Sequence, residues 1–221
     1  MFGIENLSNK RLISQAASEM AKYGQLFYAK GWNLATSSNY SAVISTEPLN
    51  LLMTASGKHK GELTDADFVV IDEKLKVVDH GANYSVNNLK PSAEAALHVT
   101  LAKKAGAKAV LHSHSIWSTI VSRRYFSQGY VTLHDFEMLK ALQGINSHDA
   151  TVRIVILENS QDIGALAQAV EKQLSDGNIE HAFLLKGHGL YTWGSSLAEA
   201  RNQIEALEFM FEVIGQGGDD K

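Results

Sequence analysis

The stretch Ala109-Val110-Leu111-His112-Ser113-His114 decides how the rest of this sequence is interpreted. Its apolar residues predict a buried strand, and two histidines stand at the end of that strand. Side chains two residues apart on a strand point to the same face. His112 and His114 therefore face the same way, where two charged imidazoles would repel each other and a metal ion would hold both neutral.

A third histidine, His188, stands between two glycines far downstream, in Gly187-His188-Gly189. Three histidines that leave one coordination position open form the ligand set of some catalytic zinc sites. We therefore predict that His112, His114 and His188 bind zinc, with one Zn²⁺ per subunit. The other histidines lack such spacing, and we predict structural or surface roles for His59, His80, His98, His134, His148 and His181.

The composition limits the class of protein. The chain has 221 residues, of which 45% are hydrophobic and 20% charged, and these values predict one folded domain over residues 1–221 with a sizeable core. A net charge of −4 gives no electrostatic reason to expect a nucleic-acid or membrane partner. The sequence contains no cysteine, which excludes disulfides and thiolate ligands, so a transition-metal site must use histidine and carboxylate side chains.

The two ends of the chain carry weaker signals. Residues 1–9 show neither the basic nor the apolar region of a signal peptide, and no apolar run approaches the ~18 residues of a transmembrane helix. We therefore expect a soluble, cytoplasmic protein. Residues 215–221 are rich in glycine and aspartate, and we predict that they form a flexible tail.

Helical spacing of apolar residues predicts helices at residues 8–30, 92–104, 116–122, 135–143, 162–174 and 197–214. We expect Ser8 or Asn9 to cap the first helix, Gly31 to end it, and Asp135 to lie near the cap of the fourth. Apolar runs predict strands at residues 41–44, 51–54, 68–71, 109–111, 151–157, 182–185 and 190–193. Several strands follow one another without a helix between them, which favours an α/β fold with a largely antiparallel sheet.

Two acidic residues lie in stretches that allow more than one interpretation. Glu94, in Pro91-Ser92-Ala93-Glu94, stands at the predicted start of a helix, where an acid complements the helix dipole. The same position also suits a carboxylate beside the metal, and the local sequence does not decide between the two. Glu137 has the spacing of an ordinary acidic residue on a helix surface.

Two turns combine hydroxyl side chains with backbone N–H groups, a combination that suits a phosphate. They are Thr54-Ala55-Ser56-Gly57-Lys58 and Pro91-Ser92. A simple turn and a simple helix cap explain these stretches equally well. Neither stretch is a Walker motif or a GxGxxG fingerprint, so the sequence gives no indication of nucleotide binding.

A set of motifs occurs in an order that resembles the class II aldolase/adducin superfamily. They are Ser37-Ser38-Asn39, Thr54-Ala55-Ser56-Gly57, Pro91-Ser92-Ala93-Glu94, His112-Ser113-His114 and Gly187-His188-Gly189. Three later stretches resemble one branch of that superfamily, the methylthioribulose-1-phosphate dehydratases. These stretches are residues 137–144, residues 157–163, and residues 187–194 followed by 205–209.

The resemblance implies a three-layer α/β sandwich, with a central, mainly antiparallel sheet flanked by helices. It also implies a homo-oligomer, a C4 tetramer in typical relatives, with active sites near subunit interfaces. His112, His114 and His188 match the zinc ligands of the family. Glu137 matches the acid/base of the dehydratases, and Glu94 matches the carboxylate that aldolase relatives use. The positions that match the substrate-phosphate site are Asn39, Ser56, Gly57, Lys60 and Ser92.

The reaction that the resemblance implies is the zinc-dependent dehydration of a ketose phosphate in methionine salvage: 5-methylthioribulose 1-phosphate is converted to 2,3-diketo-5-methylthiopentyl 1-phosphate. As its acid/base, Glu137 needs a pKa raised towards neutrality. Some dehydratases carry a cysteine in the substrate site where this chain has Ala95, so that contact is missing or replaced here. Two alternatives stay open: a sugar-phosphate aldolase or pentulose-phosphate 4-epimerase of the same superfamily, and a non-catalytic, adducin-like scaffold.

Overall fold

A single mixed sheet forms the centre of the computed structural model, which describes residues 2–79 and 89–217, with side chains from Lys10 onward. Its strands are β1 (Asn39–Thr46), β2 (Leu49–Thr54), β3 (Phe68–Asp72), β4 (Ala109–Ser113), β5 (Tyr130–Leu133), β6 (Val152–Leu157), β7 (Ala182–Leu185) and β8 (Gly189–Gly194). They lie in the order β3-β2-β1-β4-β8-β7-β6-β5. Neighbouring strands are antiparallel, except that β6 and β7 run parallel.

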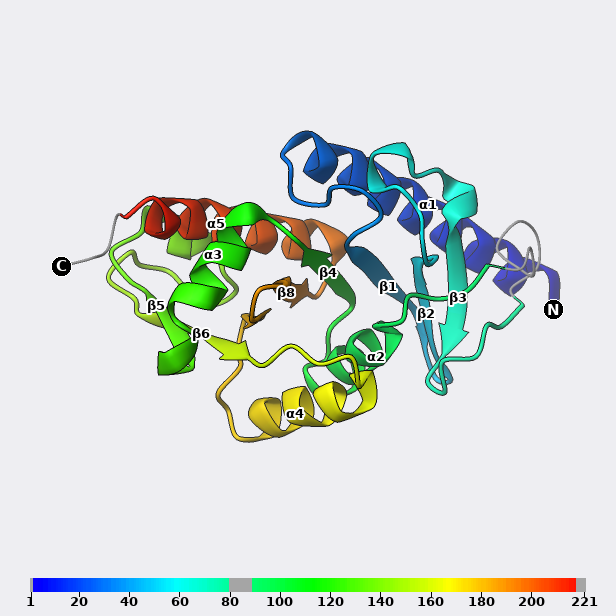
Figure 1. Cartoon of the computed structure of the whole chain (residues 1–221). Coiled ribbons are helices and arrows are strands. Elements are labelled where there is room, and N and C mark those ends of the chain that lie inside the picture. Colours follow the sequence, from blue (N-terminus) through cyan, green and yellow to red (C-terminus); the bar gives the residue numbers. More distant parts are fainter. Residues whose placement is uncertain (1, 80–88, 218–221) are drawn as a thin grey trace.

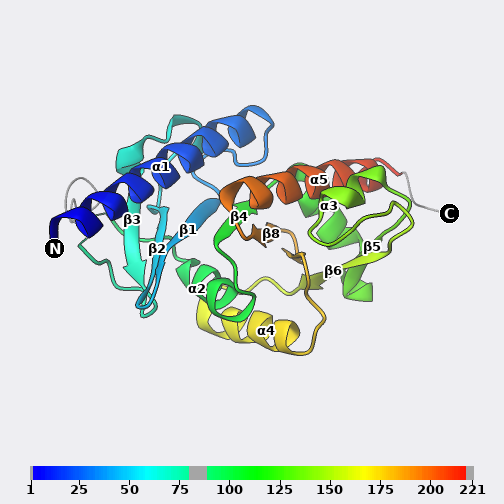
Figure 2. The ribbon, with the colours of Figure 1, turned by 180° about the vertical axis from the view of Figure 1, so that it is seen from behind.

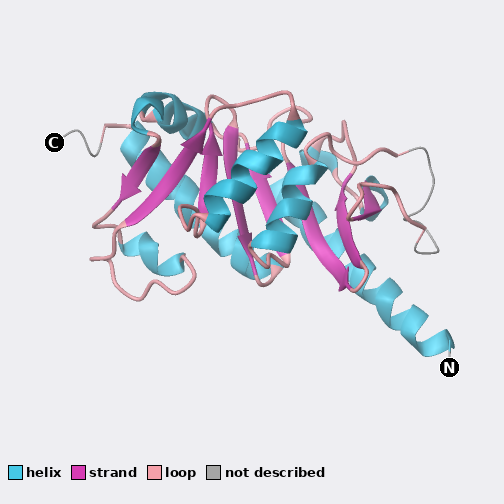
Figure 3. Cartoon of the chain, turned by 90° about the horizontal axis from the view of Figure 1, so that it is seen from below, coloured by secondary structure: helices cyan, strands magenta, loops and turns pink. Residues whose placement is uncertain are grey.

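Helices cover both faces of this sheet. They are α1 (Phe2–Ala29), α2 (Ala95–Lys104), α3 (Ile116–Arg124), α4 (Ile163–Ser175) and α5 (Leu197–Gly215). Figure 1 shows α1 and α5 along one side of the sheet and α2 and α4 along the other, and Figure 2 gives the same arrangement from behind. α2 packs against α4, as Figure 3 shows from below, and α3 packs against α5. The predicted three-layer sandwich with a mainly antiparallel sheet is confirmed.

The alternation of side chains on β4 divides the core between the two helical layers. Leu111 belongs to the apolar cluster that α1, α3 and α5 share. Val110 belongs to a second cluster, which α2 and α4 cover. Because the side-chain period of a strand is two, His112 points to the same face as Val110, whereas Ser113 points to the face of Leu111. The two helical layers therefore contact opposite sides of the histidine stretch.

One row of residues across the sheet places the functional side chains. In the strand register, His112 on β4 stands opposite Asn39 on β1 and opposite Tyr191 on β8. Tyr191 in turn stands opposite Phe183 on β7. Directly opposite residues share a face of the sheet, and the ring of Tyr191 stacks on the ring of His112 with 3.9 Å between centroids. Asn39, His112 and Tyr191 therefore lie together on the side of α2 and α4.

The first predicted helix ends as expected but begins earlier. Gly31 has a φ of 75° and ends the helical segment, because glycine adopts the left-handed conformation without strain. The proposed cap at Ser8 or Asn9 is wrong, since both residues lie inside α1. Residues 2–7 contain no proline that would stop the helix, so it continues towards the N-terminus.

Two other helix predictions need correction. α2 begins at Ala95 and not at Ser92, because residues 92–95 first form a turn closed by the Ala95 N–H on the Ser92 carbonyl at 3.1 Å. The segment predicted as a helix at 135–143 is the short 3₁₀ helix η4 (Glu137–Ala141). Asp135 has a φ of 59°, a left-handed conformation that places it outside the helix cap. The short strand β5 was not predicted.

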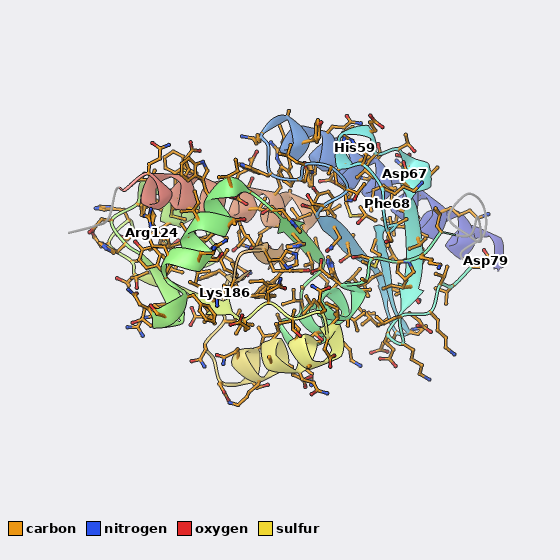
Figure 4. All side chains as sticks on the ribbon, viewed as in Figure 1. His59, Asp67, Phe68, Asp79, Arg124 and Lys186 are labelled. Carbon is orange, nitrogen blue, oxygen red and sulfur yellow. The ribbon has the colours of Figure 1, made fainter. Side chains whose placement is uncertain are left out.

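The C-terminal helix is held at its end by α3. Figure 4 labels Arg124, whose guanidinium donates hydrogen bonds to the carbonyls of Ile214 and Gly215 at 2.9 and 3.1 Å. Gly215, the first residue of the predicted tail, is thus the last residue of α5.

Residues 218–221 lie outside the described residues, as does His80. No helix in the described part of the chain combines the length and the hydropathy that are needed to cross a membrane.

Candidate metal centre

The structure brings three histidines from two distant parts of the chain together. His112 ends the buried run of β4, His114 follows it directly, and His188 lies in the turn between β7 and β8. The Nε2 atoms of His112 and His114 are 2.7 Å apart, and those of His114 and His188 are 3.2 Å apart. Nitrogen ligands at about 2.0–2.1 Å from a tetrahedral zinc ion lie about 3.4 Å from one another. The spacing of the three Nε2 atoms therefore suits one metal ion.

Hydrogen bonds at Nδ1 of His112 and His188 determine which ring nitrogen is free to bind a metal ion. His112 Nδ1 donates to the backbone carbonyl of Leu190 at 2.8 Å, and His188 Nδ1 donates to Asn159 Oδ1 at 3.1 Å. In a neutral imidazole with hydrogen on Nδ1, the lone pair is on Nε2. Both Nε2 atoms thus face the common point as acceptors. Metal-binding histidines carry the same outer hydrogen bond.

Burial keeps all three imidazoles neutral. Desolvation lowers the pKa of His112 well below its usual value, and the neighbouring His188 lowers it further. Desolvation also lowers the pKa of His114 to about 2, and it lowers the pKa of His188. Neutral imidazole is the form that binds a metal ion. The donor set therefore fits a zinc-type ion without any change of protonation.

Glu94 lies beside the histidines. Its Oε2 is 3.5 Å from Nε2 of His112, and its Oε1 is 3.4 Å from Nε2 of His188. The residue occupies the N-cap position of α2, yet its side chain makes no capping hydrogen bond. Of the two interpretations that the sequence left open, the geometry supports a carboxylate beside the metal.

A buried chain of hydrogen bonds holds the Glu94 carboxylate from behind. Asn39 Nδ2 donates to Glu94 Oε2 at 2.7 Å and to Ser92 Oγ at 3.1 Å. The Oδ1 of Asn39 is hydrogen-bonded to Nε2 of the fully buried His98, whose Nδ1 contacts Ser41 Oγ at 2.7 Å. Desolvation lowers the pKa of His98 to about 4, so this histidine is neutral. His98 has the structural role that was predicted for it.

A cavity of about 300 Å³ opens next to the histidines. The predicted site residues that line it are Asn39, Ser56, Gly57, Lys60, Ser92, Glu94, His114 and His188. His112 is fully buried behind them. Four further lining residues come from one later segment and were not predicted as site residues: Asn159, Ser160, Gln161 and Ile163. The segment that contains them resembled the dehydratase branch, but nothing in its local pattern pointed to this cavity.

Part of the cavity lining has the character of an anion site. Lys60 is 1% exposed, and its Nζ donates to the carbonyls of Lys58 and Thr36 at 2.7 and 3.2 Å. No carboxylate in the described part of the chain pairs with Nζ of Lys60, and desolvation lowers the pKa of this lysine to about 8. The buried hydroxyl of Ser38 also has no hydrogen-bond partner there, although the residue lines the cavity. Gly57 completes the turn with a φ of 74° that favours glycine.

Glu137 does not line this cavity in the structure of the single chain. It begins η4, its side chain is 73% exposed, and it is absent from the cavity lining. Its carboxylate pairs with Lys140 at 2.5 Å, and this hydrogen bond lowers its pKa. The expectation that the pKa of Glu137 is raised is therefore wrong for the single chain. Ala95, where some dehydratases have a cysteine, is the buried first residue of α2 and does not line the cavity.

Gly189 explains why a glycine follows the third histidine. A Cβ atom at this position would lie 2.0 Å from the carbonyl oxygen of Ser113 and 3.1 Å from Cε1 of His112. Any side chain would therefore push β8 away from β4. The glycine allows the close strand approach that places His188 next to the other two histidines.

Known proteins match the chain over nearly its whole length. The family model "Class II Aldolase and Adducin N-terminal domain" matches residues 18–214. A methylthioribulose-1-phosphate dehydratase of Alcanivorax borkumensis is 42% identical over 199 residues, covering 90% of this chain and 89% of that protein. The enzyme of the same name from Pseudomonas fluorescens is 40% identical over 199 residues, covering 90% and 91% of the two chains.

Solved structures of the same architecture are more distant in sequence. The YgbL protein of Klebsiella pneumoniae, a putative aldolase/epimerase/decarboxylase by its description, aligns with a TM-score of 0.75 at 24% identity, covering 95% of this chain and 92% of that chain. An L-fuculose 1-phosphate aldolase aligns with a TM-score of 0.71 at 20% identity, covering 90% and 84%. These structures share the fold, and the sequence relatives narrow the family. The chain therefore belongs to the class II aldolase and adducin family, in its methylthioribulose-1-phosphate dehydratase branch.

Proposed function

We propose that the chain is a hydro-lyase that removes water from 5-methylthioribulose 1-phosphate in methionine salvage. The product is 2,3-diketo-5-methylthiopentyl 1-phosphate. The observation that carries the proposal is the 42% identity, over 90% of the chain, to a protein named for this reaction. His114, His188 and Glu94 line a cavity of about 300 Å³, with His112 buried behind them, and these four residues are the machinery that such a reaction needs.

The metal in this proposal is zinc, with one ion per subunit on His112, His114 and His188. All three ligands are neutral nitrogen donors, a set that zinc accepts, and the chain has no thiolate that would favour a different site. A bound zinc ion supplies Lewis-acid chemistry, which makes the C3 hydrogen of a 2-ketose more acidic.

Within the cavity of a single chain, Glu94 is the residue that can transfer a proton to or from the substrate. The Asn39 amide holds one oxygen of this carboxylate at 2.7 Å, which leaves the other oxygen available to take the proton from C3. Loss of the C4 hydroxyl as water then needs a proton donor on the leaving oxygen. A dehydration therefore calls for a second acid/base residue or for the return of the same proton.

Glu137 stays our candidate for the second acid/base residue, and the geometry defines how it can act. Its side chain is exposed and lies outside the cavity of its own chain. Glu137 therefore acts only when an oligomer presents it to the cavity of another copy, where the loss of solvent would raise its pKa from the value that Lys140 now lowers. We propose a homotetramer with this arrangement.

The substrate phosphate in this proposal is bound by Ser56, Gly57, Lys60 and Ser92, which all line the cavity. Among the described residues, the buried ammonium of Lys60 has no acidic partner and the hydroxyl of Ser38 has no hydrogen-bond partner, so both can donate to a phosphate. Asn39 serves the site differently, because its side-chain NH2 group donates to Ser92 and Glu94. A bound phosphate fixes the reacting carbons relative to the metal.

A sugar-phosphate aldolase is the second candidate, because Glu94 lies beside the histidines while Glu137 does not line the same cavity. Glu94 is the carboxylate that matches the aldolase relatives. An aldolase breaks the C3–C4 bond, whereas a dehydratase loses the C4 hydroxyl. A non-catalytic scaffold has no physical need for three neutral imidazoles that converge next to a carboxylate.

The identity of the product distinguishes these functions. Purified protein with zinc is incubated in parallel with 5-methylthioribulose 1-phosphate and with L-fuculose 1-phosphate, and the products are identified by mass spectrometry. A diketone formed with loss of water from the first substrate supports the proposal. Cleavage to a triose phosphate and an aldehyde contradicts it and supports the aldolase, and turnover of neither substrate by metal-loaded protein supports the scaffold.

A further inference from the structure

The three histidines are not held in place in the same way. The rings of His112 and His188 are each fixed by an outer hydrogen bond, to Leu190 and to Asn159. The ring of His114 makes hydrogen-bond contacts to the other two imidazoles, and no described residue accepts a hydrogen bond from its Nδ1. The position of His114 therefore depends on its backbone. That backbone is tied at one point by its N–H, which donates to the carbonyl of Trp32 at 2.7 Å.

Glu208 on α5 holds the backbone on both sides of His114. The hydroxyl of Ser113 donates to Oε1 of Glu208, and the hydroxyl of Ser115 donates to Oε2. These serines are the residues directly before and after His114 in the chain. Ser113 can reach α5 because alternate side chains on β4 point to opposite faces, which sends its hydroxyl away from the metal side.

Ser115 also connects Glu208 to the start of α3. Its Oγ accepts a hydrogen bond from the backbone N–H of Ser118 at 2.9 Å and so caps α3. The carboxylate of Glu208 therefore joins three elements, the end of β4, the start of α3 and the middle of α5. His114 lies at their junction.

The fold by itself does not explain a carboxylate at this position. Glu208 is 1% exposed, and its neighbours Leu207 and Phe211 on α5 are fully buried apolar residues. Burial raises the pKa of Glu208 to about 7, which reflects how poorly this environment solvates a charge. Replacing a buried polar group together with all its partners by packed apolar residues is often neutral or stabilising, so stability alone does not require Glu208 and its two serines. A role other than stability accounts better for this side chain.

We propose that Glu208 is a positioning residue for the metal centre, which sets the place of His114 through the hydroxyls of Ser113 and Ser115. This inference rests on the metal site of the proposed function and not on the identity of the substrate. It assigns Glu208 no contact with substrate or metal. Its effect is on the geometry and the affinity of the three-histidine site.

Substitutions at Glu208 separate this role from simple stability. Glu208→Gln keeps an oxygen that accepts from one serine and an amide that donates to the other, so both ties persist. Glu208→Met has a similar length but leaves both serine hydroxyls without a partner. Ser113→Ala removes one tie without changing α5, and it keeps the inference testable if Glu208→Met does not fold.

A matched control lies on the same helix. Gln203 is also buried in α5, and its Nε2 donates to the carbonyl of Trp193 on β8, away from His114. Gln203→Met therefore removes a buried hydrogen bond of α5 without touching Ser113 or Ser115. It reports how much metal affinity is lost through general destabilisation.

The measurements are the zinc dissociation constant, obtained by competition with a chelator, the visible spectrum of the Co²⁺-substituted protein, and the Tm of the metal-free protein. We expect Glu208→Met to weaken zinc binding roughly 10–100-fold and to change the cobalt spectrum. Glu208→Gln should stay near wild type, and Ser113→Ala should weaken binding at a metal-free Tm close to that of wild type. Gln203→Met should lower Tm and leave zinc binding and the cobalt spectrum unchanged.

Two results would overturn the inference. One is wild-type zinc affinity and an unchanged cobalt spectrum in both Glu208→Met and Ser113→Ala. The other is a loss of affinity in Gln203→Met as large as that in Glu208→Met. A wild-type protein that binds zinc but does not dehydrate the proposed substrate contradicts the proposed function and leaves this inference standing, whereas a wild-type protein that binds no zinc contradicts both.

Discussion

The carboxylate of Glu94 lies against the ring of His112, with 3.5 Å between Oε2 of the glutamate and Nε2 of the histidine. The other carboxylate oxygen is 3.4 Å from Nε2 of His188. Both oxygens are thus directed towards the point where the imidazoles converge. The cavity opens at the same point, so Glu94 can exchange a proton with a substrate that is held there.

Replacing Glu94 by glutamine tests this role. The amide keeps the size of the side chain but takes no proton, so we expect turnover to fall by about 10²–10⁴-fold, the range of general acid/base catalysis. Three histidine ligands remain, and the metal content should stay close to that of wild type. The measurement pairs kcat with elemental analysis of the same sample. Near-normal kcat in metal-loaded Glu94→Gln would exclude Glu94 as the base.

Replacing His112 by alanine should remove both the metal and the activity. In the proposed site this residue is one of three nitrogen ligands, and the two that remain would not complete the site. His181→Asn is the control, because His181 lies outside this group and outside the cavity lining. Elemental analysis of both variants gives the answer. Full zinc occupancy in His112→Ala would contradict the ligand assignment.

Mixed oligomers test whether Glu137 acts in the cavity of another copy. Glu137→Gln and His112→Ala are each expected to be inactive, for different reasons. If each site combines the histidines of one subunit with Glu137 of another, reassembly of the two variants in equal amounts restores about a quarter of the wild-type activity.

No recovery in verified mixed oligomers would mean that Glu137 acts in its own chain or not at all. Activity of the Glu137→Gln protein alone decides between these two cases. A Lys140→Ala variant controls for the exposed ion pair that Glu137 makes in the single chain.

The buried Lys60 predicts a loss of substrate affinity at alkaline pH. Desolvation lowers its pKa to about 8, so its ammonium is charged below this pH and neutral above it. If Lys60 binds the substrate phosphate, kcat/KM falls as the pH rises through about 8. Lys60→Arg stays charged and should shift this decline to higher pH, whereas Lys60→Met should have low kcat/KM throughout. An alkaline decline that is the same in wild type and Lys60→Met would remove Lys60 from phosphate binding.

The sequence predicted well those features that depend on local spacing. Alternation along β4 placed His112 and His114 on one side, and the run of short strands indicated a mostly antiparallel sheet. The convergence of His188 with them depends on strand pairing, because β8 lies next to β4 while 74 positions separate His188 from His114. The ordered motifs of the resemblance supplied that link.

Local sequence spacing gave no prediction for residues whose roles depend on tertiary contacts. His98 and Glu208 lie on helices whose spacing gives no reason to single them out, and their roles come from partners 59 and 95 positions away. Glu94 was ambiguous because a helix start and a metal site favour the same residue type. The start of α1 was placed too late, since a polar residue such as Ser8 can cap a helix or lie inside it.

The central claim is that this chain dehydrates a ketose phosphate at its three-histidine metal site. The most direct measurement titrates zinc into chelator-treated protein, with formation of the diketone from 5-methylthioribulose 1-phosphate as the readout. We expect no turnover without metal and a rate that rises in proportion to bound zinc until one ion is bound per subunit. Full diketone formation by metal-free protein, or cleavage of the substrate to a triose phosphate, would contradict it.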